Sequence, residues 1–128
     1  MKASEIRIGN WLQNSKGEFI QVNSLTVKKG SNRLLINDAP SKEFSPIYLT
    51  PEILHLCGFS EKISTYNIVY ILDSFRLEHD HDGEGFILLN SEKIIKKPIV
   101  ITYLHKLQNI YHTLTNEGLS INLKKARA

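Results

Sequence analysis

One stretch near the C-terminus carries apolar residues at helical spacing. Six residues share one side of the predicted helix: Tyr103, Leu104, Leu107, Ile110, Tyr111 and Leu114. At about 100° per residue they fall within roughly one third of the circumference, the width that a helix needs to lie on a sheet. The spacing predicts a helix over residues 102–117, with Thr102 as its N-cap and Gly118 as a left-handed C-cap.

Most of the remaining chain alternates apolar and polar residues or is rich in β-branched residues, which is typical of strands. Residues 1–45 are predicted to form a meander that curls into a small sheet, with an SH3-like barrel as one candidate. Segment 65–72 is apolar on both faces, which indicates a central strand. The predicted strands are 6–13, 18–26, 33–37, 65–72, 75–79, 85–90, 94–101 and a short edge strand at 119–123.

Turn and cap residues add two local predictions. An Asp-Gly pair at residues 82–83 predicts a type I′ hairpin that pairs Leu77 with Leu88 and His79 with Phe86. Residues 38–41 break the strand pattern. A short helix is then predicted from its N-cap, its first residue and its stop, which are Thr50, Pro51 and Gly58.

These elements predict one α+β domain over residues 1–128. Its parts are an N-terminal meander (1–45), a segment of helix, strands and C-terminal helix (46–123), and a basic tail (124–128). The antiparallel sheet is expected to be covered by one long C-terminal helix and one short helix.

Composition narrows the class of protein. The net charge is +3, and the single cysteine, Cys57, excludes an internal disulfide and fits a reducing compartment. The first residues lack the apolar core of a signal peptide, and the longest apolar run, residues 68–72, is too short to span a bilayer. We therefore expect a cytoplasmic protein with no membrane partner.

The most acidic stretch, residues 78–84, concentrates possible metal ligands. Read as a calcium loop it has Leu89 where the bidentate glutamate is required, and a zinc reading lacks a third ligand. No metal or cofactor is therefore predicted. A projecting acidic tip could still contact a partner through Asp80, Asp82 and Glu84.

Polar residues on the long helix are a second candidate surface. His105 and His112 are about 10 Å apart along the axis, too far to share one zinc. With Gln108 they are predicted to form a polar rim, for which a partner-facing role is the alternative.

On the first predicted strand, Trp11 and Arg7 share the face opposite Ile6, Ile8 and Leu12. Either another part of the chain covers Trp11, or Trp11 and Arg7 form an exposed binding anchor.

Basic residues support an alternative reading as a nucleic-acid-binding domain, with Trp11 as a stacking platform. The candidates are Lys28, Lys29, Lys96, Lys97, Lys124, Lys125 and Arg127.

A catalytic function has less support in the sequence than either binding function. No phosphate loop or nucleophile elbow is present, and Cys57 lies in an apolar helix where its thiol is expected to be a core group. We therefore expect no enzyme activity.

Three blocks of sequence resemble a family of small proteins from Bacteroidota genomes, prophages and phages. The blocks are residues 3–11 (ASEIRIGNW), 47–59 (IYLTPEILHLCGF) and 103–119 (YLHKLQNIYHTLTNEGL). Family members typically read "LRIGN", "PLTxxxLxxxGF" and "HxLQNLYxALTGEEL". The resemblance spans nearly the whole chain, although Asn116-Glu-Gly stands where members usually have Gly-Glu-Glu. No catalytic residues are established for that family, so the resemblance carries none over.

The resemblance implies a mobile-element context. Small non-enzymatic proteins of mobile elements often bind and block host machinery, including CRISPR nucleases. The expected function is therefore a binding module acting on a host protein or ribonucleoprotein in the bacterial cytoplasm, as an anti-defence inhibitor of the anti-CRISPR kind.

Overall fold

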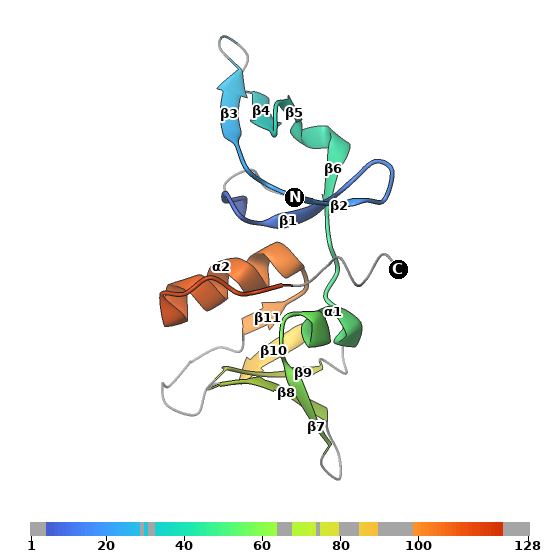
Figure 1. Ribbon diagram of the computed structural model, residues 1–128, viewed down its shortest axis with the longest axis vertical. Coiled ribbons are helices and arrows are strands. Elements are labelled where there is room, and N and C mark those ends of the chain that lie inside the picture. Colours follow the sequence, from blue (N-terminus) through green and yellow to red (C-terminus); the bar gives the residue numbers. More distant parts are fainter. Residues whose placement is uncertain are drawn as a thin grey trace.

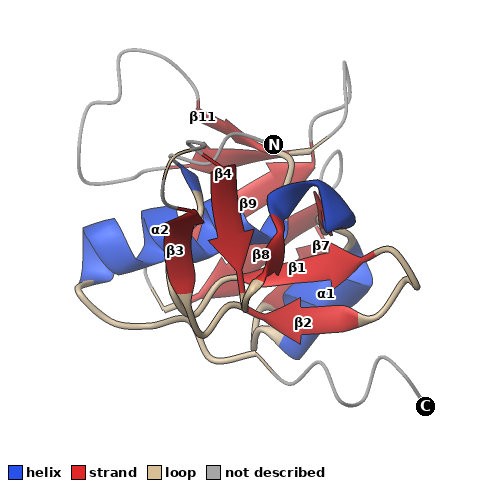
Figure 2. Cartoon of the chain, turned by 90° about the horizontal axis from the view of Figure 1, so that it is seen from above, coloured by secondary structure: helices blue, strands red, loops and turns tan. Residues whose placement is uncertain are grey.

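The computed structural model of the chain describes residues 5–28, 30, 33–63, 68–73, 75–79, 85–89 and 99–121. It confirms the α+β class, with three antiparallel sheets, a 12-residue helix and a shorter one (Figure 1). The long helix lies between a five-stranded sheet and the strands of the N-terminal half. Seen from above, those N-terminal strands lie over both helices (Figure 2).

The N-terminal half forms two three-stranded sheets, in the orders β2-β1-β6 and β3-β4-β5. Their strands are β1 (Trp11–Asn14), β2 (Phe19–Gln21), β3 (Leu25–Lys28), β4 (Arg33–Ile36), β5 (Ala39–Pro40) and β6 (Phe44–Pro46). The chain passes from one sheet to the other between β2 and β3, and a 3-10 helix (η2, Ser41–Glu43) precedes β6. The strands are antiparallel as predicted, but they form two sheets and not one curled meander, because β6 returns to pair with β1; the SH3-like arrangement stays a prediction.

The C-terminal half contains α1 (Pro51–Leu56), α2 (Leu104–Thr115) and a sheet in the order β11-β10-β9-β8-β7. Its strands are β7 (Ser60–Ile63), β8 (Ile68–Leu72), β9 (Phe75–His79), β10 (Phe86–Leu89) and β11 (Ile99–Ile101). The predicted register is confirmed, because Leu77 pairs with Leu88 and His79 with Phe86. Strand β8, predicted to be central, is paired on both sides but lies next to the edge strand β7, and β9 is the middle strand.

Both helices cover the same face of the five-stranded sheet. Residues from α1, α2 and alternate sheet positions form the larger core, which includes Leu54, Leu77, Phe86, Leu104 and Leu107. A smaller core closes the N-terminal half and consists of Ile6, Leu12, Val22 and Ile36. The short helix begins as predicted, since the hydroxyl of Thr50 accepts a hydrogen bond from the backbone N–H of Ile53 (3.1 Å).

The first predicted strand is wrong in its first half. Residues 8–9 form a turn, in which Gly9 has φ +95°, and pairing starts only at Trp11. The turn reverses the alternation, so that Ile8 is 68% exposed although Ile6 is buried. The predicted strand 18–26 is divided between two sheets, and the predicted break at 38–41 contains β5. Strand β7, which is exposed throughout, lacks the alternation that predicts strands and was not foreseen.

The boundaries and buried side of α2 also differ from the prediction. Its N-cap is Tyr103, without a side-chain cap bond, and the left-handed residue after it is Asn116 (φ 60°), which tolerates that conformation. Leu114, predicted to be buried, is 49% exposed, and His105, predicted to lie on a polar rim, is 1% exposed. His105 is buried because the N-terminal half covers α2 on a second side. Residues 119–121 form no strand in the structure.

Candidate functional site

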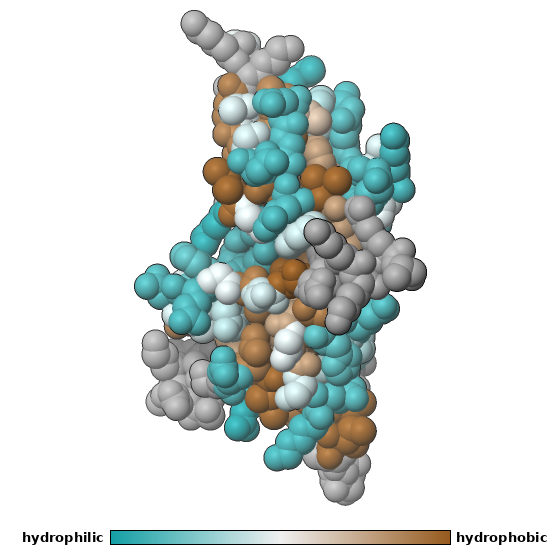
Figure 3. Space-filling model, in the orientation of Figure 1, coloured by the Kyte–Doolittle hydropathy of each residue, from teal (hydrophilic) through white to brown (hydrophobic). Residues whose placement is uncertain are grey.

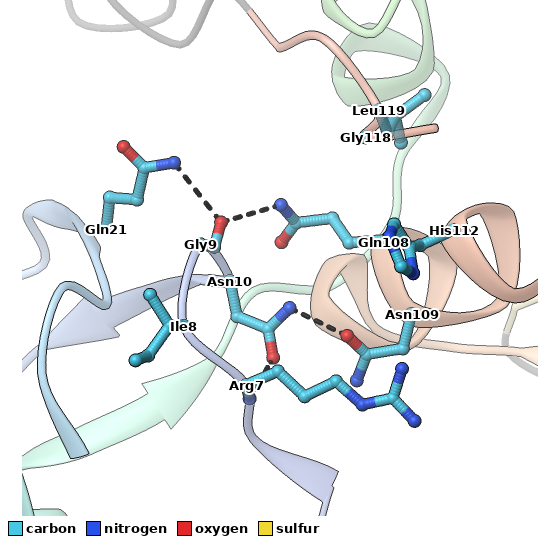
Figure 4. A pocket seen from close by; sticks show the side chains of 10 residues that line it. All are labelled: Arg7, Ile8, Gly9, Asn10, Gln21, Gln108, Asn109, His112, Gly118 and Leu119. Carbon is cyan, nitrogen blue, oxygen red and sulfur yellow. Dashed lines mark hydrogen bonds between the residues drawn. The ribbon is translucent and has the colours of Figure 1, made fainter. Parts of the chain in front are cut away.

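Amide side chains join the N-terminal loop to α2. The amide nitrogen of Asn10, a buried residue, donates to the side-chain oxygen of Asn109 (2.9 Å), and Asn109 donates in turn to the carbonyl of Glu5 (2.7 Å). The side-chain oxygen of Asn10 accepts the backbone N–H of Arg7 (2.7 Å). Figure 4 shows the side chain of Asn10, on the N-terminal loop, facing that of Asn109 on α2.

Gln108 forms the second half of this connection. Its oxygen accepts the backbone N–H of Trp11 (2.8 Å), and its nitrogen donates to the carbonyl of Gly9 (2.9 Å), which Gln21 also contacts (3.2 Å). A loop that leaves the sheet pattern must satisfy its backbone groups in another way. Asn10, Gln108 and Asn109 do so here, and we call these three residues the amide bridge.

Residues from three distant blocks of the sequence meet around α2. The amide bridge takes Asn10 from the first block and Gln108 and Asn109 from the third. Backbone hydrogen bonds of 2.8 and 2.9 Å join residues 47–49 of the second block to residues 102–104. These contacts fasten the N-terminal half to the helix.

Beside the amide bridge lies an open cleft of about 340 Å³, drawn in Figure 4. Its lining residues come from the N-terminal loop, β2, α2 and the segment after it: Arg7, Ile8, Gly9, Asn10, Gln21, Gln108, Asn109, His112, Gly118 and Leu119. The bridge amides are already engaged with one another and with the loop. The side chains of Arg7 and His112 are exposed and bond to no other described residue, which leaves them available to a ligand.

Three predicted contact residues, Arg7, Gln108 and His112, therefore lie around one cleft, although they come from opposite ends of the chain. Sequence reasoning missed Ile8, which the predicted alternation placed inside. The exposed-anchor reading of Trp11 is wrong. Its side chain is half-buried and packs against the larger core, so the alternative reading, a covered face, is confirmed.

The remaining predicted contacts lie outside the described residues and stay predictions. They are Asp80, Asp82 and Glu84 of the acidic tip, and Lys29, Lys96, Lys97, Lys124, Lys125 and Arg127 of the basic clusters. Lys28 ends β3, but its side chain is likewise not described.

His105 is the most unusual buried residue of α2. Neither imidazole nitrogen has a hydrogen-bond partner among the described residues, and the ring stacks on that of Tyr103, with 5.9 Å between centroids and 14° between planes. Burial lowers the pKa of His105; Lys106 adds to this effect and the carboxylate of Glu5 opposes it. A buried imidazole without partners is costly to protonate.

We expect this burial to make the protein acid-sensitive. Below about pH 6.5 the unfolded chain takes up a proton that folded His105 resists, so stability falls as the pH decreases, by at most about 1.4 kcal/mol per pH unit. His105→Leu should remove this part of the slope in chemical denaturation between pH 7 and 5. His112→Leu, at an exposed histidine of the same helix, is the control. An unchanged slope in His105→Leu would contradict the assignment.

Burial also raises the pKa of the Cys57 thiol to about 12, as expected for a core residue. Within the described ranges, no group of three or more histidine, cysteine or acidic residues could hold a metal ion. No helix among those residues is long and apolar enough to cross a membrane.

Comparison of the chain with protein-family models, curated proteins and solved structures finds no match.

Proposed function

We propose that the protein is a non-enzymatic binding module, and that its cleft between the N-terminal loop and α2 receives a segment of a partner protein. The observation that carries this proposal is the set of unengaged side chains at the cleft. Arg7 supplies a guanidinium, His112 an imidazole, and Ile8 an aliphatic side chain that is 68% exposed. A cation beside an exposed aliphatic group is a combination that recognises protein surfaces.

The amide bridge supports this proposal because it holds the cleft walls together. A cleft formed between fixed walls binds at a lower conformational cost than one that must first be ordered. The guanidinium of Arg7 favours a carboxylate, which it can contact through two parallel hydrogen bonds. The partner segment is therefore expected to carry an acidic residue next to an apolar one.

The resemblance to mobile-element proteins supports a more specific proposal. The partner is a host defence protein or ribonucleoprotein, with a CRISPR nuclease as one candidate, and the protein acts as its inhibitor in the bacterial cytoplasm. The structure supports this proposal only through the cleft, and the class of partner comes from the resemblance.

Affinity capture from a Bacteroidota lysate tests the proposal. We expect the intact chain to enrich a protein or ribonucleoprotein that Arg7→Glu/Ile8→Asp loses by at least about tenfold, because the first change reverses the charge of Arg7 and the second replaces an apolar side chain with an acidic one. The control is Arg33→Glu/Val27→Asp, which makes the same kinds of change at exposed residues of β4 and β3.

Each contrary outcome removes a different part of the proposal. No enrichment by the intact chain would overturn the binding module, and equal capture by the cleft variant would overturn the cleft as its site. Capture that disappears after nuclease treatment and weakens steeply with salt would favour the alternative, direct binding of nucleic acid through the basic clusters.

A further inference from the structure

The five-stranded sheet has a second face, which points away from both helices. In β9, Phe75 and Leu77 are buried on the helix side, so Arg76 and Glu78 lie on the opposite side. The strand register places nine residues on this outer face in two rows. The first row is Val100, Ile87, Glu78, Val69 and Lys62; the second is Leu89, Arg76, Ile71 and Ser60.

Most of this face is aliphatic. Val69, Ile71, Ile87 and Leu89 are partly buried but pack against neither core, and Val100 is 45% exposed. Figure 3 shows apolar residues on the side of this end of the molecule that is turned towards the viewer, whereas the residues of the outer face are assigned from the strand register. Contiguous apolar groups on a sheet face mark an interaction surface.

The charges on the face have an ordered arrangement. Arg76 and Glu78 lie two residues apart in β9, the middle strand, and neither forms an ion pair with another described residue. Lys62 stands at the edge of the face, on β7. The face therefore has one positive and one negative side chain at its centre, with aliphatic residues on both sides.

We propose that a second copy of this chain covers the outer face, around a two-fold axis that lies between the two sheets, runs perpendicular to the strands and passes over the middle of β9. In this arrangement the β9 strands of the two copies lie face to face and antiparallel. Arg76 of each copy then meets Glu78 of the other, which forms two equivalent ion pairs. Ile87 meets Leu89, and Val69 meets Ile71, so apolar residues contact apolar residues on both sides of the ion pairs, while Lys62 meets Ser60 at the edge of the face.

The charge pattern selects this axis over its alternative. A two-fold axis parallel to the strands would place Glu78 against Glu78 and Arg76 against Arg76, and like charges in contact are strongly unfavourable. Edge-to-edge pairing through β7 is opposed as well, because that strand exposes Glu61 and Lys62, and charged residues on edge strands discourage such pairing. The contact is thus face to face, as in a β-sandwich.

The size of the face limits the strength of the dimer. Five strands at about 4.8 Å spacing span roughly 24 Å, and the two rows are about 7 Å apart. A face of these dimensions buries less area than the roughly 800 Å² per partner of a standard interface. The dimer should therefore be weak, and its population should depend on the protein concentration.

Sedimentation velocity on the full chain, from about 10 µM to about 1 mM, tests the arrangement by charge exchange. We expect the intact chain to shift towards dimer as the concentration rises. Arg76→Glu or Glu78→Arg alone should weaken association by at least about tenfold, because each reversal creates two like-charge contacts. The double variant Arg76→Glu/Glu78→Arg should restore it, since the ion pairs re-form with exchanged partners.

The controls reverse exposed charges outside this face, with Arg33→Glu on β4 and Glu43→Arg in η2, and should leave association unchanged. Ile87→Lys is a further variant that should abolish the dimer through the apolar contacts alone. Circular dichroism verifies that each variant is folded. An intact chain that stays monomeric at 1 mM, or a double variant as weak as the single ones, would overturn the proposal.

Discussion

Asn10→Ala should lower the free energy of unfolding by about 2–4 kcal/mol. The side chain of Asn10 is 3% exposed and bonds both to the backbone N–H of Arg7 and to the side chain of Asn109. Its removal leaves a donor and an acceptor without partners, at a cost of about 1–3 kcal/mol for each buried group. Chemical denaturation at pH 7 measures the loss.

A double-mutant cycle with Asn109→Ala separates the bridge from other effects. Because the two side chains bond to each other across 99 positions of sequence, we expect the double variant to lose less than the sum of the single ones. Asn23→Ala, at an exposed asparagine, is the matched control and should cost less than about 0.5 kcal/mol. Additive losses would show that the bridge does not act as one unit.

Leu107→Ala should cost about 2–5 kcal/mol. Leu107 is fully buried in the larger core, where α2 packs on the sheet, and its truncation leaves a cavity that the surrounding structure fills only in part. The helix carries both Gln108 and Asn109, so destabilising it also loosens the cleft. Denaturation gives the loss of stability, and capture of the partner should weaken in parallel.

Leu114→Ala is the matched control on the same helix. The helical spacing assigns Leu114 to the same stripe, but the side chain is 49% exposed, and we expect a loss below about 1 kcal/mol. Equal losses at both positions would contradict the packing of α2 described above.

The candidate site could be predicted only in part. Arg7, Gln108 and His112 were recognised as polar residues next to apolar patterns, which marks them as surface groups without placing them together. Their meeting depends on the turn at Gly9, whose positive φ interrupts an otherwise regular alternation. That turn exposes Ile8 and directs Asn10 towards the helix.

Sequence alone determined the elements whose signals are local. The hydroxyl of Thr50 bonds to the backbone three residues ahead, and the Asp-Gly pair in the sequence predicts the observed pairing of Leu77 with Leu88, because both signals depend on a few neighbouring residues. Tertiary structure decided which sides of α2 are buried. A single amphipathic stripe predicts one covered face of the helix, but the N-terminal half packs on a second face. His105 is therefore enclosed and Gln108 is hydrogen-bonded to the N-terminal loop, while Leu114 remains at the surface. Contacts between positions about a hundred residues apart leave no periodic signal in either segment, and only the folded chain brings them together.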